Sequence, residues 1–165
     1  MTIISLKRKF DLFLEMEKLF SPFAENIMQT SEKLARRFGC DYIDSEHIFL
    51  AIIDESLKNA NGENLVIKIL KHLNINLFNL IEDVESSFNG NGKAITTDKI
   101  PLTKIAELVL KISYLESEIF NSNTISPVHI LLAYLRVGSA FSKGKLYAKY
   151  NLSYDQVNNC INLLA

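Results

Sequence analysis

Two short stretches carry residue types that could do chemistry, and the first is DYIDSEHIFLAII at residues 41–53. Glu46 and His47 stand together near the start of a predicted helix. A carboxylate beside an imidazole could bind a basic ligand or work as an acid–base pair. The structural interpretation is stronger, because an acidic residue in the first turn complements the helix dipole and a histidine there can bond the preceding backbone. Contact between Glu46 and a partner is the alternative.

The second stretch, NTISPVHILLAYL at residues 123–135, repeats this pattern 82 positions later, a separation that we call the repeat offset. Pro127 suits the first position of a helix, where its missing N–H costs nothing, and Ser126 before it is a good N-cap. His129 stands where His47 stands in the first stretch. The residues predicted to cap the two helices are Asp44, Ser45, His47, Ser126, Pro127 and His129, with Asp44 and Ser45 as competing choices for one cap.

Metal and nucleotide chemistry are further alternatives. His47, His129 and Cys40 could be metal ligands, and a small helical enzyme or metal protein could use Glu46 with the two histidines. The histidines belong to separate stretches and not to one helical turn, so we predict no metal site. The glycine–lysine pair in NGNGKAITT lacks the preceding strand and the spacing of a phosphate loop. We therefore predict no bound cofactor and no catalytic residue.

The composition is that of a globular domain. Hydrophobic residues make up 48% and charged residues 22% of the 165 residues, and no segment approaches the roughly 18 apolar residues of a membrane span. With 18 basic and 19 acidic residues, no positive field would attract nucleic acid. Two cysteines make no disulfide framework, and the N-terminus lacks the pattern of a signal peptide. We expect a cytoplasmic protein that binds neither nucleic acid nor membrane.

The spacing of apolar residues predicts an all-α fold. The predicted helices lie near residues 22–38, 45–56, 63–73, 76–88, 104–120, 127–137, 143–150 and 153–164. The clearest break is NGNGKAITTDKIP at residues 89–101, which is typical of a linker. We predict a repeat at 20–88, this linker, and a second repeat at 102–165. Each four-helix repeat would bury too little surface alone, so we expect both in one compact domain about a pseudo-twofold axis.

Residues 1–19 extend beyond the first repeat, and their apolar residues have helical spacing. We predict a helix here that packs on the domain or offers a partner surface, with Phe10 and Phe13 as candidate contacts. Aromatic residues are also more plentiful than one small core needs. We expect most of them in the core and the remainder in an exposed protein-binding groove. This set comprises Phe10, Phe13, Phe20, Phe23, Phe49, Phe78, Tyr134, Tyr147, Tyr150 and Tyr154.

Together the two stretches resemble the N-terminal domain of the Clp-type AAA+ unfoldases, the ClpA, ClpB and ClpC group. The first copy is ARRFGCDYIDSEHIFLAII followed by ILKHLNINLFNLI, and the second is LESEIFNSNTISPVHILLAYL followed by LYAKYNLSYDQV. The resemblance covers residues 20–164 and is closest to ClpC-like chains. It implies the double-repeat helical fold predicted above.

The resemblance also implies a non-catalytic domain that binds adaptor proteins and unfolded or tagged substrates. The ATPase ring, its ATP and a partner protease would come through a longer parent chain, and the isolated domain is expected to be a monomer. Glu46 matches a glutamate that ClpC-like domains use to bind phosphorylated arginine, whereas Val128 stands at the matching place of the second copy. Two alternatives stay open: a free-standing domain that competes for adaptors, and the N domain of a ClpV-type secretion ATPase, which also carries an early helix.

Overall fold

The computed structural model describes residues 20–59, 64–90, 93, 95–140 and 144–164. In this part of the chain all regular secondary structure is helical, and the predicted all-α fold class is confirmed. The predicted helix at 1–19, with Phe10 and Phe13, lies outside the described residues. The two cysteines, Cys40 and Cys160, are both buried as free thiols.

Within the described residues, each half of the chain contributes four helices. The first half contains α2 (Pro22–Arg37), α3 (Ser45–Lys58), α4 (Leu65–His72) and α5 (Leu77–Ser86). The second half contains α6 (Lys104–Ile119), α7 (Pro127–Ala140), α8 (Gly144–Lys149) and α9 (Tyr154–Leu164). The bounds of α6 and α7 are those of α2 and α3 shifted by the repeat offset, and α9 follows α5 at a slightly smaller separation. All bounds agree closely with the predicted ranges.

The ends of equivalent helices use equivalent residues. Ser21 is the N-cap of α2 and Thr103 that of α6, and each hydroxyl accepts a hydrogen bond from the backbone N–H three residues later, at 3.2 and 3.1 Å. After these helices, Gly39 and Asn121 have positive φ angles of 68° and 50°. Glycine and asparagine adopt this left-handed conformation most readily. Both halves therefore stop their first helix in the same way.

Backbone hydrogen bonds cross between the halves. The N–H of Ser21 donates to the carbonyl of Ile125 at 3.0 Å, and the N–H of Thr103 donates to the carbonyl of Ile43 at 2.9 Å. The two donors are separated by the repeat offset, and so are the two acceptors. The start of the first helix of each half is thus fastened to the loop before the central helix of the other half.

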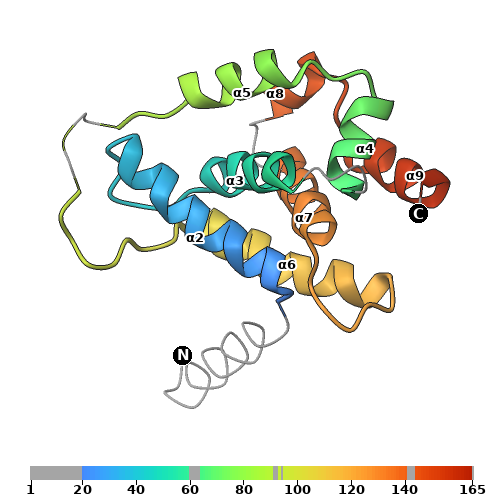
Figure 1. The fold of residues 1–165 in the computed structure, drawn as a ribbon, viewed down its shortest axis with the longest axis horizontal. Helices are drawn as coiled ribbons and strands as arrows, with labels where there is room; N and C mark the ends of the chain where they lie inside the picture. The colour runs from blue at the N-terminus through green and yellow to red at the C-terminus, as the bar shows by residue number, and fades with distance from the viewer. Residues whose placement is uncertain (1–19, 60–63, 91–92, 94, 141–143, 165) are drawn as a thin grey trace.

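The core lies around α3 and α7, which occupy the centre of the molecule (Figure 1). The ring of Phe49 stacks on that of Tyr134 with 4.5 Å between centroids, and Tyr147 meets both rings edge-on. All three side chains are buried. Both central helices bury residues around most of their circumference, as expected of helices covered on every side.

The described part of residues 87–103 contains no helix and lies against the end of α2. The guanidinium of Arg36 donates to three carbonyl oxygens of this segment, those of Ile95, Thr97 and Asp98, at 3.3, 2.8 and 3.1 Å. At Gly90 a Cβ atom would lie 1.5 Å from the carbonyl oxygen of Phe38, so this close approach requires glycine. Among the described helices, none is long and apolar enough to cross a membrane.

Candidate functional site

The turn that begins α3 contains the first group of predicted site residues. Asp44 is the N-cap, and its Oδ1 accepts hydrogen bonds from the Ser45 N–H at 2.9 Å and the Thr103 hydroxyl at 2.8 Å. Nδ1 of His47 accepts from the Asp44 N–H at 2.9 Å, which completes a capping box. Ser45, the competing choice for the cap, is instead the first residue of the helix. Because Thr103 belongs to the second half, this cap also joins the two halves.

Glu46 and His47 are covered by the protein itself. Their exposed fractions are 6% and 1%. The Ser45 hydroxyl donates to Oε2 of Glu46 at 3.1 Å, and the His47 ring stacks on that of Phe88 with 4.3 Å between centroids. Such burial counts against direct contact between Glu46 and a partner, which stays a prediction. It is consistent with a structural role for both side chains.

The turn that begins α7 repeats the histidine contact. Nδ1 of His129 accepts from the Ser126 N–H at 3.0 Å, and Pro127 is the first residue of the helix. Burial lowers the pKa of His129, although the carboxylate of Glu116 and a backbone hydrogen bond with Thr124 act in the opposite direction. A neutral imidazole suits this turn because Nδ1 must accept a hydrogen bond.

The two histidine turns do not combine into one site. Each histidine contacts the backbone of its own turn, three residues earlier. Within the described part of the chain, no group of three or more His, Cys, Asp or Glu side chains could hold a metal ion. The arrangement therefore supports helix capping and offers no assembled chemistry.

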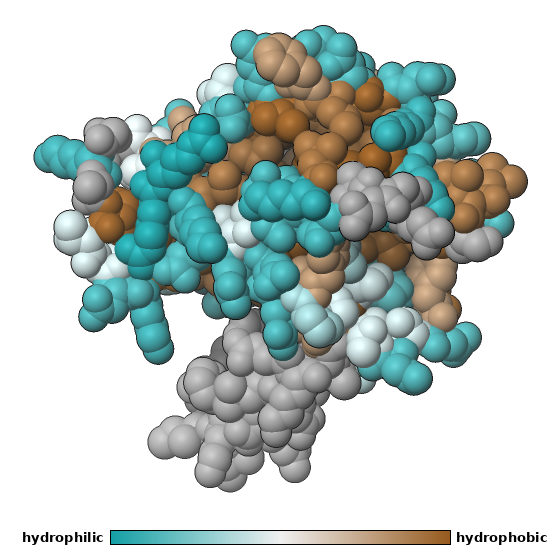
Figure 2. All heavy atoms as spheres, viewed as in Figure 1, coloured by the Kyte–Doolittle hydropathy of each residue, from teal (hydrophilic) through white to brown (hydrophobic). Residues whose placement is uncertain are grey.

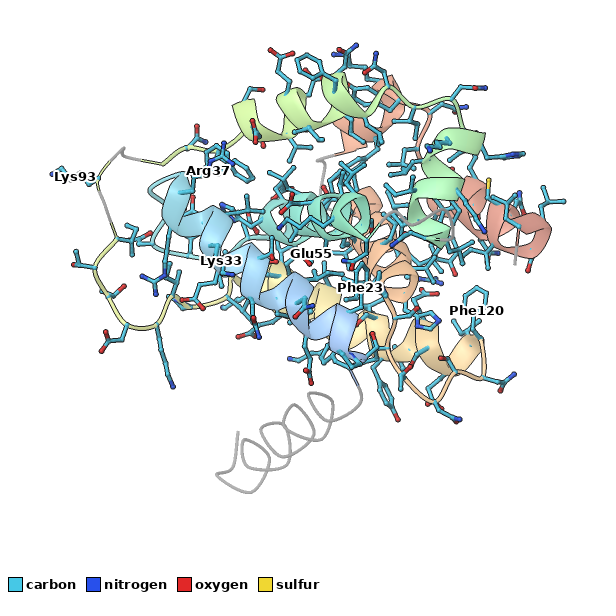
Figure 3. The ribbon with its side chains drawn as sticks, viewed as in Figure 1. Phe23, Lys33, Arg37, Glu55, Lys93 and Phe120 are labelled. Atoms are coloured by element: carbon cyan, nitrogen blue, oxygen red, sulfur yellow. The ribbon has the colours of Figure 1, made fainter. Side chains whose placement is uncertain are left out.

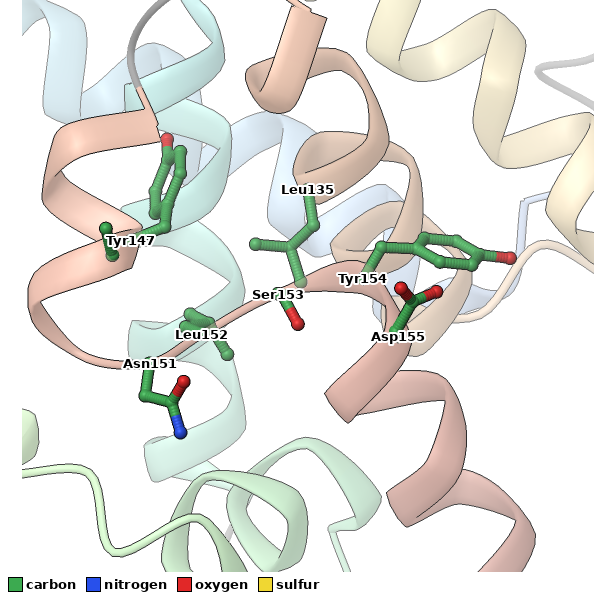
Figure 4. Close-up of a pocket in the computed structure, with 8 residues that line it drawn as sticks. Leu135, Tyr147, Asn151, Leu152, Ser153, Tyr154 and Asp155 are labelled. Atoms are coloured by element: carbon green, nitrogen blue, oxygen red, sulfur yellow. The ribbon is translucent and has the colours of Figure 1, made fainter.

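A cavity of about 350 Å³ lies between α7, α8 and α9 (Figure 4). Its lining residues are Leu135, Tyr147, Ala148, Asn151, Leu152, Ser153, Tyr154 and Asp155. The volume falls within the range of small-molecule sites. The lining contains one carboxylate, that of Asp155, and no histidine, cysteine or basic side chain. Burial raises the pKa of the Tyr147 phenol, so that this hydroxyl stays neutral. These residues form no recognisable catalytic group.

A smaller hollow of about 100 Å³ lies on the first half, between α2, α3 and α5, and we name it the α2–α3–α5 groove. Its aliphatic lining residues, which we call the floor, are Leu34, Leu50, Leu57 and Ile81. Its charged lining residues, which we call the rim, are Arg37, Asp54 and Glu85. Leu57 is 41% exposed, so the apolar floor reaches solvent. Figure 2 shows hydrophobic residues gathered between α5, at the top of the view, and α3 beneath it.

Buried polar contacts hold the α2 and α3 walls of this groove together. The hydroxyl of Thr30 donates to the carboxylate of Glu55 at 2.7 Å, and Lys58 Nζ contacts the same oxygen at 3.0 Å. Burial by itself raises the pKa of Glu55, but the hydrogen bonds from Thr30 and Lys58, with the charges of Lys58 and Lys33, outweigh it and lower the pKa. Figure 3 shows Lys33 and Glu55 on the neighbouring helices α2 and α3.

The third wall, α5, is attached to the second half of the molecule. The carboxylate of Asp83 accepts hydrogen bonds from Lys149 Nζ at 2.6 Å and from the Tyr150 hydroxyl. These two partners, Lys149 first, lower the pKa of Asp83. Lys149 is the last residue of α8 and Tyr150 follows it, so these contacts join α5 to the second half. Ile81 and Glu85 of α5 line the groove together with residues of α2 and α3.

The rim charges differ in how they are paired. Asp54 forms an ion pair with Lys58 at 2.7 Å. Arg37 stands at the end of α2 (Figure 3), with its guanidinium carbon 5.3 Å from the centroid of the Phe38 ring. Within the described residues neither Arg37 nor Glu85 takes part in an ion pair. The groove thus offers a cation from α2 and a carboxylate from α5.

The equivalent place in the second half is filled. Glu116 occupies the position of Leu34 and Arg136 that of Asp54, each one repeat offset later in the chain. Glu116 is fully buried, and its carboxylate accepts from Arg136 Nε at 2.6 Å and from the Tyr154 hydroxyl at 3.0 Å. The Arg136 guanidinium also lies over the Tyr154 ring, 4.2 Å from its centroid. An ion pair and an aromatic ring take the place of the open aliphatic floor.

The sequence analysis did not predict the residues of the groove floor. It expected aromatic side chains in a binding groove, whereas the floor is aliphatic. Of the predicted set, Phe49, Tyr134 and Tyr147 belong to the core, and Phe78 on α5 is 75% exposed. The spacing in LFNLIEDVE was the one sequence signal that could have indicated the α5 side of the groove. Phe78, Ile81 and Glu85 in this stretch share one face of a helix. The three leucines of the floor carry no local mark that separates them from core residues.

Residues 19–143 match the family described as the Clp repeat (R) N-terminal domain. This match spans well over half of the chain, and the chain belongs to that family. The family is a non-catalytic N-terminal domain of Clp-type ATPases. The predicted relationship to Clp-type unfoldases is confirmed.

Individual relatives agree with this assignment. The chloroplastic chaperone protein ClpC of Pisum sativum is 31% identical over 143 residues, which are 87% of this chain and 14% of that protein. The chloroplastic ClpC2 of Arabidopsis thaliana is 32% identical over 123 residues, which are 74% of this chain and 12% of that protein. The matched part of this chain thus spans about one seventh or less of the length of these relatives. The solved N-terminal domain of the ClpV1 ATPase from E. coli has the same fold, with a TM-score of 0.70 at 13% identity, over 95% of this chain and 92% of that one.

Proposed function

We propose that this chain is a protein-recognition domain that binds adaptor proteins and unfolded or tagged polypeptides for a Clp-type ATPase. The observation that carries this proposal is the α2–α3–α5 groove. An aliphatic floor open to solvent, ringed by charge, is the usual form of a surface that binds another polypeptide. Family membership supplies the context, because the relatives include Clp chaperones and ATP-binding subunits of a Clp protease.

The domain works by binding and not by chemistry. A partner segment contributes apolar side chains to the groove, and the area removed from water drives the association. The charges at the rim select and orient the partner more than they tighten its binding. ATP hydrolysis and unfolding then belong to ATPase modules in a longer parent chain or in an associated protein.

The test uses the purified 165-residue protein and fluorescein-labelled casein, a polypeptide without stable tertiary structure. We expect saturable binding in a fluorescence anisotropy titration. Leu57→Asp places a charge on the groove floor and weakens binding at least tenfold. The matched control is Leu163→Asp, because Leu163 on α9 is also an exposed leucine, at 72%, but lies outside the groove.

Both variants are expected to keep the helix content of the original protein, because both side chains already contact solvent. Circular dichroism checks this point. Absence of casein binding by the unmodified protein contradicts substrate recognition. Equal loss in the two variants contradicts the groove as the site of recognition.

A further inference from the structure

The α2–α3–α5 groove contains a hole of about 100 Å³. Four aliphatic residues surround it, Leu34, Leu50, Leu57 and Ile81, and they come from three helices. In a coiled coil, a side chain of one helix inserts into a hole formed by four residues of the facing helix, and here four residues from three helices form a comparable hole. Leu57 is 41% exposed and Ile81 is half-buried, so the hole is open to solvent.

The size of the hole restricts its occupant. Its volume is about 100 Å³, whereas an engineered apolar cavity of about 150 Å³ binds benzene. A leucine, isoleucine or methionine side chain is therefore a better match than the ring of phenylalanine or tryptophan. A polar side chain would lose its hydration without gaining a hydrogen bond from the aliphatic floor.

The rim adds a requirement for charge. Arg37 comes from α2 and Glu85 from α5, and neither takes part in an ion pair within the described residues. Asp54 is already paired with Lys58. A complementary partner presents an acidic residue toward Arg37 and a basic residue toward Glu85. On a helix, the residues one turn before and one turn after a central residue share its face and can carry these two charges.

We propose that the α2–α3–α5 groove binds an amphipathic helix of the partner polypeptide. One leucine, isoleucine or methionine of that helix enters the hole, and charged residues of opposite sign lie one turn before and one turn after it. This occupant rests on the proposed function as a protein-recognition domain and specifies the class of segment that the domain recognises. At the equivalent place in the described part of the second half, Glu116, Arg136 and Tyr154 form an ion pair and a hydrogen bond in place of an aliphatic hole.

The test uses fluorescein-labelled, alanine-rich peptides with one variable central position, each of about 15 residues, near the shortest length at which such helices form in water. The first peptide has glutamate at the fourth position before the central residue and lysine at the fourth position after it. We expect the form with central leucine to bind the protein at least tenfold more tightly than the forms with central alanine or tryptophan. Leu57→Asp removes this preference, whereas Leu163→Asp changes affinity less than twofold.

The rim is tested with a second peptide in which the glutamate and lysine exchange places. The helix could lie in the groove in either of two directions, and each direction suits one of the two peptides. We expect one peptide to bind at least threefold more tightly than the other. The double variant Arg37→Glu with Glu85→Lys reverses this preference. Circular dichroism identical to that of the original protein shows that the reversal comes from the rim and not from altered folding.

Each result has a definite meaning. Equal affinity for the leucine, alanine and tryptophan peptides, or an unchanged preference in the charge-reversed variant, overturns this inference. If no peptide binds while casein binds, the helical occupant is wrong and the proposed function stands. If neither casein nor any peptide binds, both are wrong. Leucine preference together with charge reversal supports both the hole and its rim.

Discussion

Where the first half of the molecule has Leu34 on the floor of an open groove, the second half has Glu116 in a buried ion pair. The two positions are separated by the repeat offset and lie on equivalent helices, α2 and α6. In the first half the groove floor reaches solvent through Leu57. In the second half, Arg136 and Tyr154 close over Glu116. The same helical framework thus carries an accessible surface in one half and a sealed contact in the other.

This difference shows how a duplicated framework can divide its tasks. The crossing hydrogen bonds and the bounds of the first two helices are equivalent in both halves. Side chains at a few equivalent positions decide whether three helices leave a hole between them. An ion pair and a hydrogen bond fix α6, α7 and α9 to one another, while the first half keeps a surface for a partner.

The largest effect is expected from breaking the sealed contact with Glu116→Ala. This change removes the acceptor that the Tyr154 hydroxyl and the Arg136 guanidinium share. Removing one member of a fully buried ion pair lowers the free energy of unfolding by about 3 to 5 kcal/mol. The Arg136 side chain is 45% exposed, so water can replace part of the lost contact. We therefore expect a smaller loss of about 2 to 3 kcal/mol. Urea unfolding measures the change in free energy. Glu107→Ala, at an exposed position on the same helix, is the control, and a loss below about 1 kcal/mol for Glu116→Ala contradicts the sealed contact.

The next effect concerns the caps of the two central helices. Asp44→Ala removes an N-cap and its hydrogen bond to Thr103, so we expect a loss of about 2 kcal/mol. Ser126→Ala removes the contact between its hydroxyl and Nδ1 of His129, three residues away, and should cost about 1 kcal/mol. Thermal unfolding of the two variants shows which one loses more stability. Asp44→Asn keeps a hydrogen-bond acceptor and should therefore be more stable than Asp44→Ala. Equal losses would show that the bond between Asp44 and Thr103 contributes nothing.

A smaller effect is expected where the first helix of each half ends. Gly39 and Asn121 both have positive φ, and a β-carbon in this conformation costs about 1 kcal/mol or more for most residues. Gly39→Ala should therefore lower the free energy of unfolding by about 1 kcal/mol. Asn121→Gly should raise it by no more than about 0.5 kcal/mol, because asparagine already tolerates this conformation. Changes of the same sign in both variants would contradict the equivalence of the two turns.

The smallest effect is a pH dependence of stability at the second histidine turn, which begins α7. Burial lowers the pKa of His129, so the unfolded chain binds the proton more readily than the folded chain. The contribution of the neutral, buried His129 to stability is complete above the ordinary histidine pKa of about 6.5. This contribution is lost as the pH falls through the lowered pKa of His129 in the folded chain. His129→Gln should reduce the loss of thermal stability between about pH 7.5 and pH 5. Parallel losses in the variant and the original protein would assign the pH dependence to other groups.

Much of the framework could be predicted from local sequence. Apolar spacing located every described helix, and Asp44 and Pro127 marked the starts of α3 and α7. Capping depends on residues within three positions of one another, so it is visible in a single stretch. The prediction of a contact between Glu46 and a partner depended on exposure, and the folded chain buries that side chain. Phe10 and Phe13 stay predictions, because they lie outside the described residues.

The sequence by itself determined the all-α fold, the ends of the helices and the equivalence of positions separated by the repeat offset, because these follow from spacing and from contacts between near neighbours. Only the tertiary structure decided which equivalent positions are open and which are sealed. Leu34, Leu57 and Ile81 come from three different helices and meet only after folding. The physical reason is that exposure depends on what packs across an element, and those neighbours are distant in the chain.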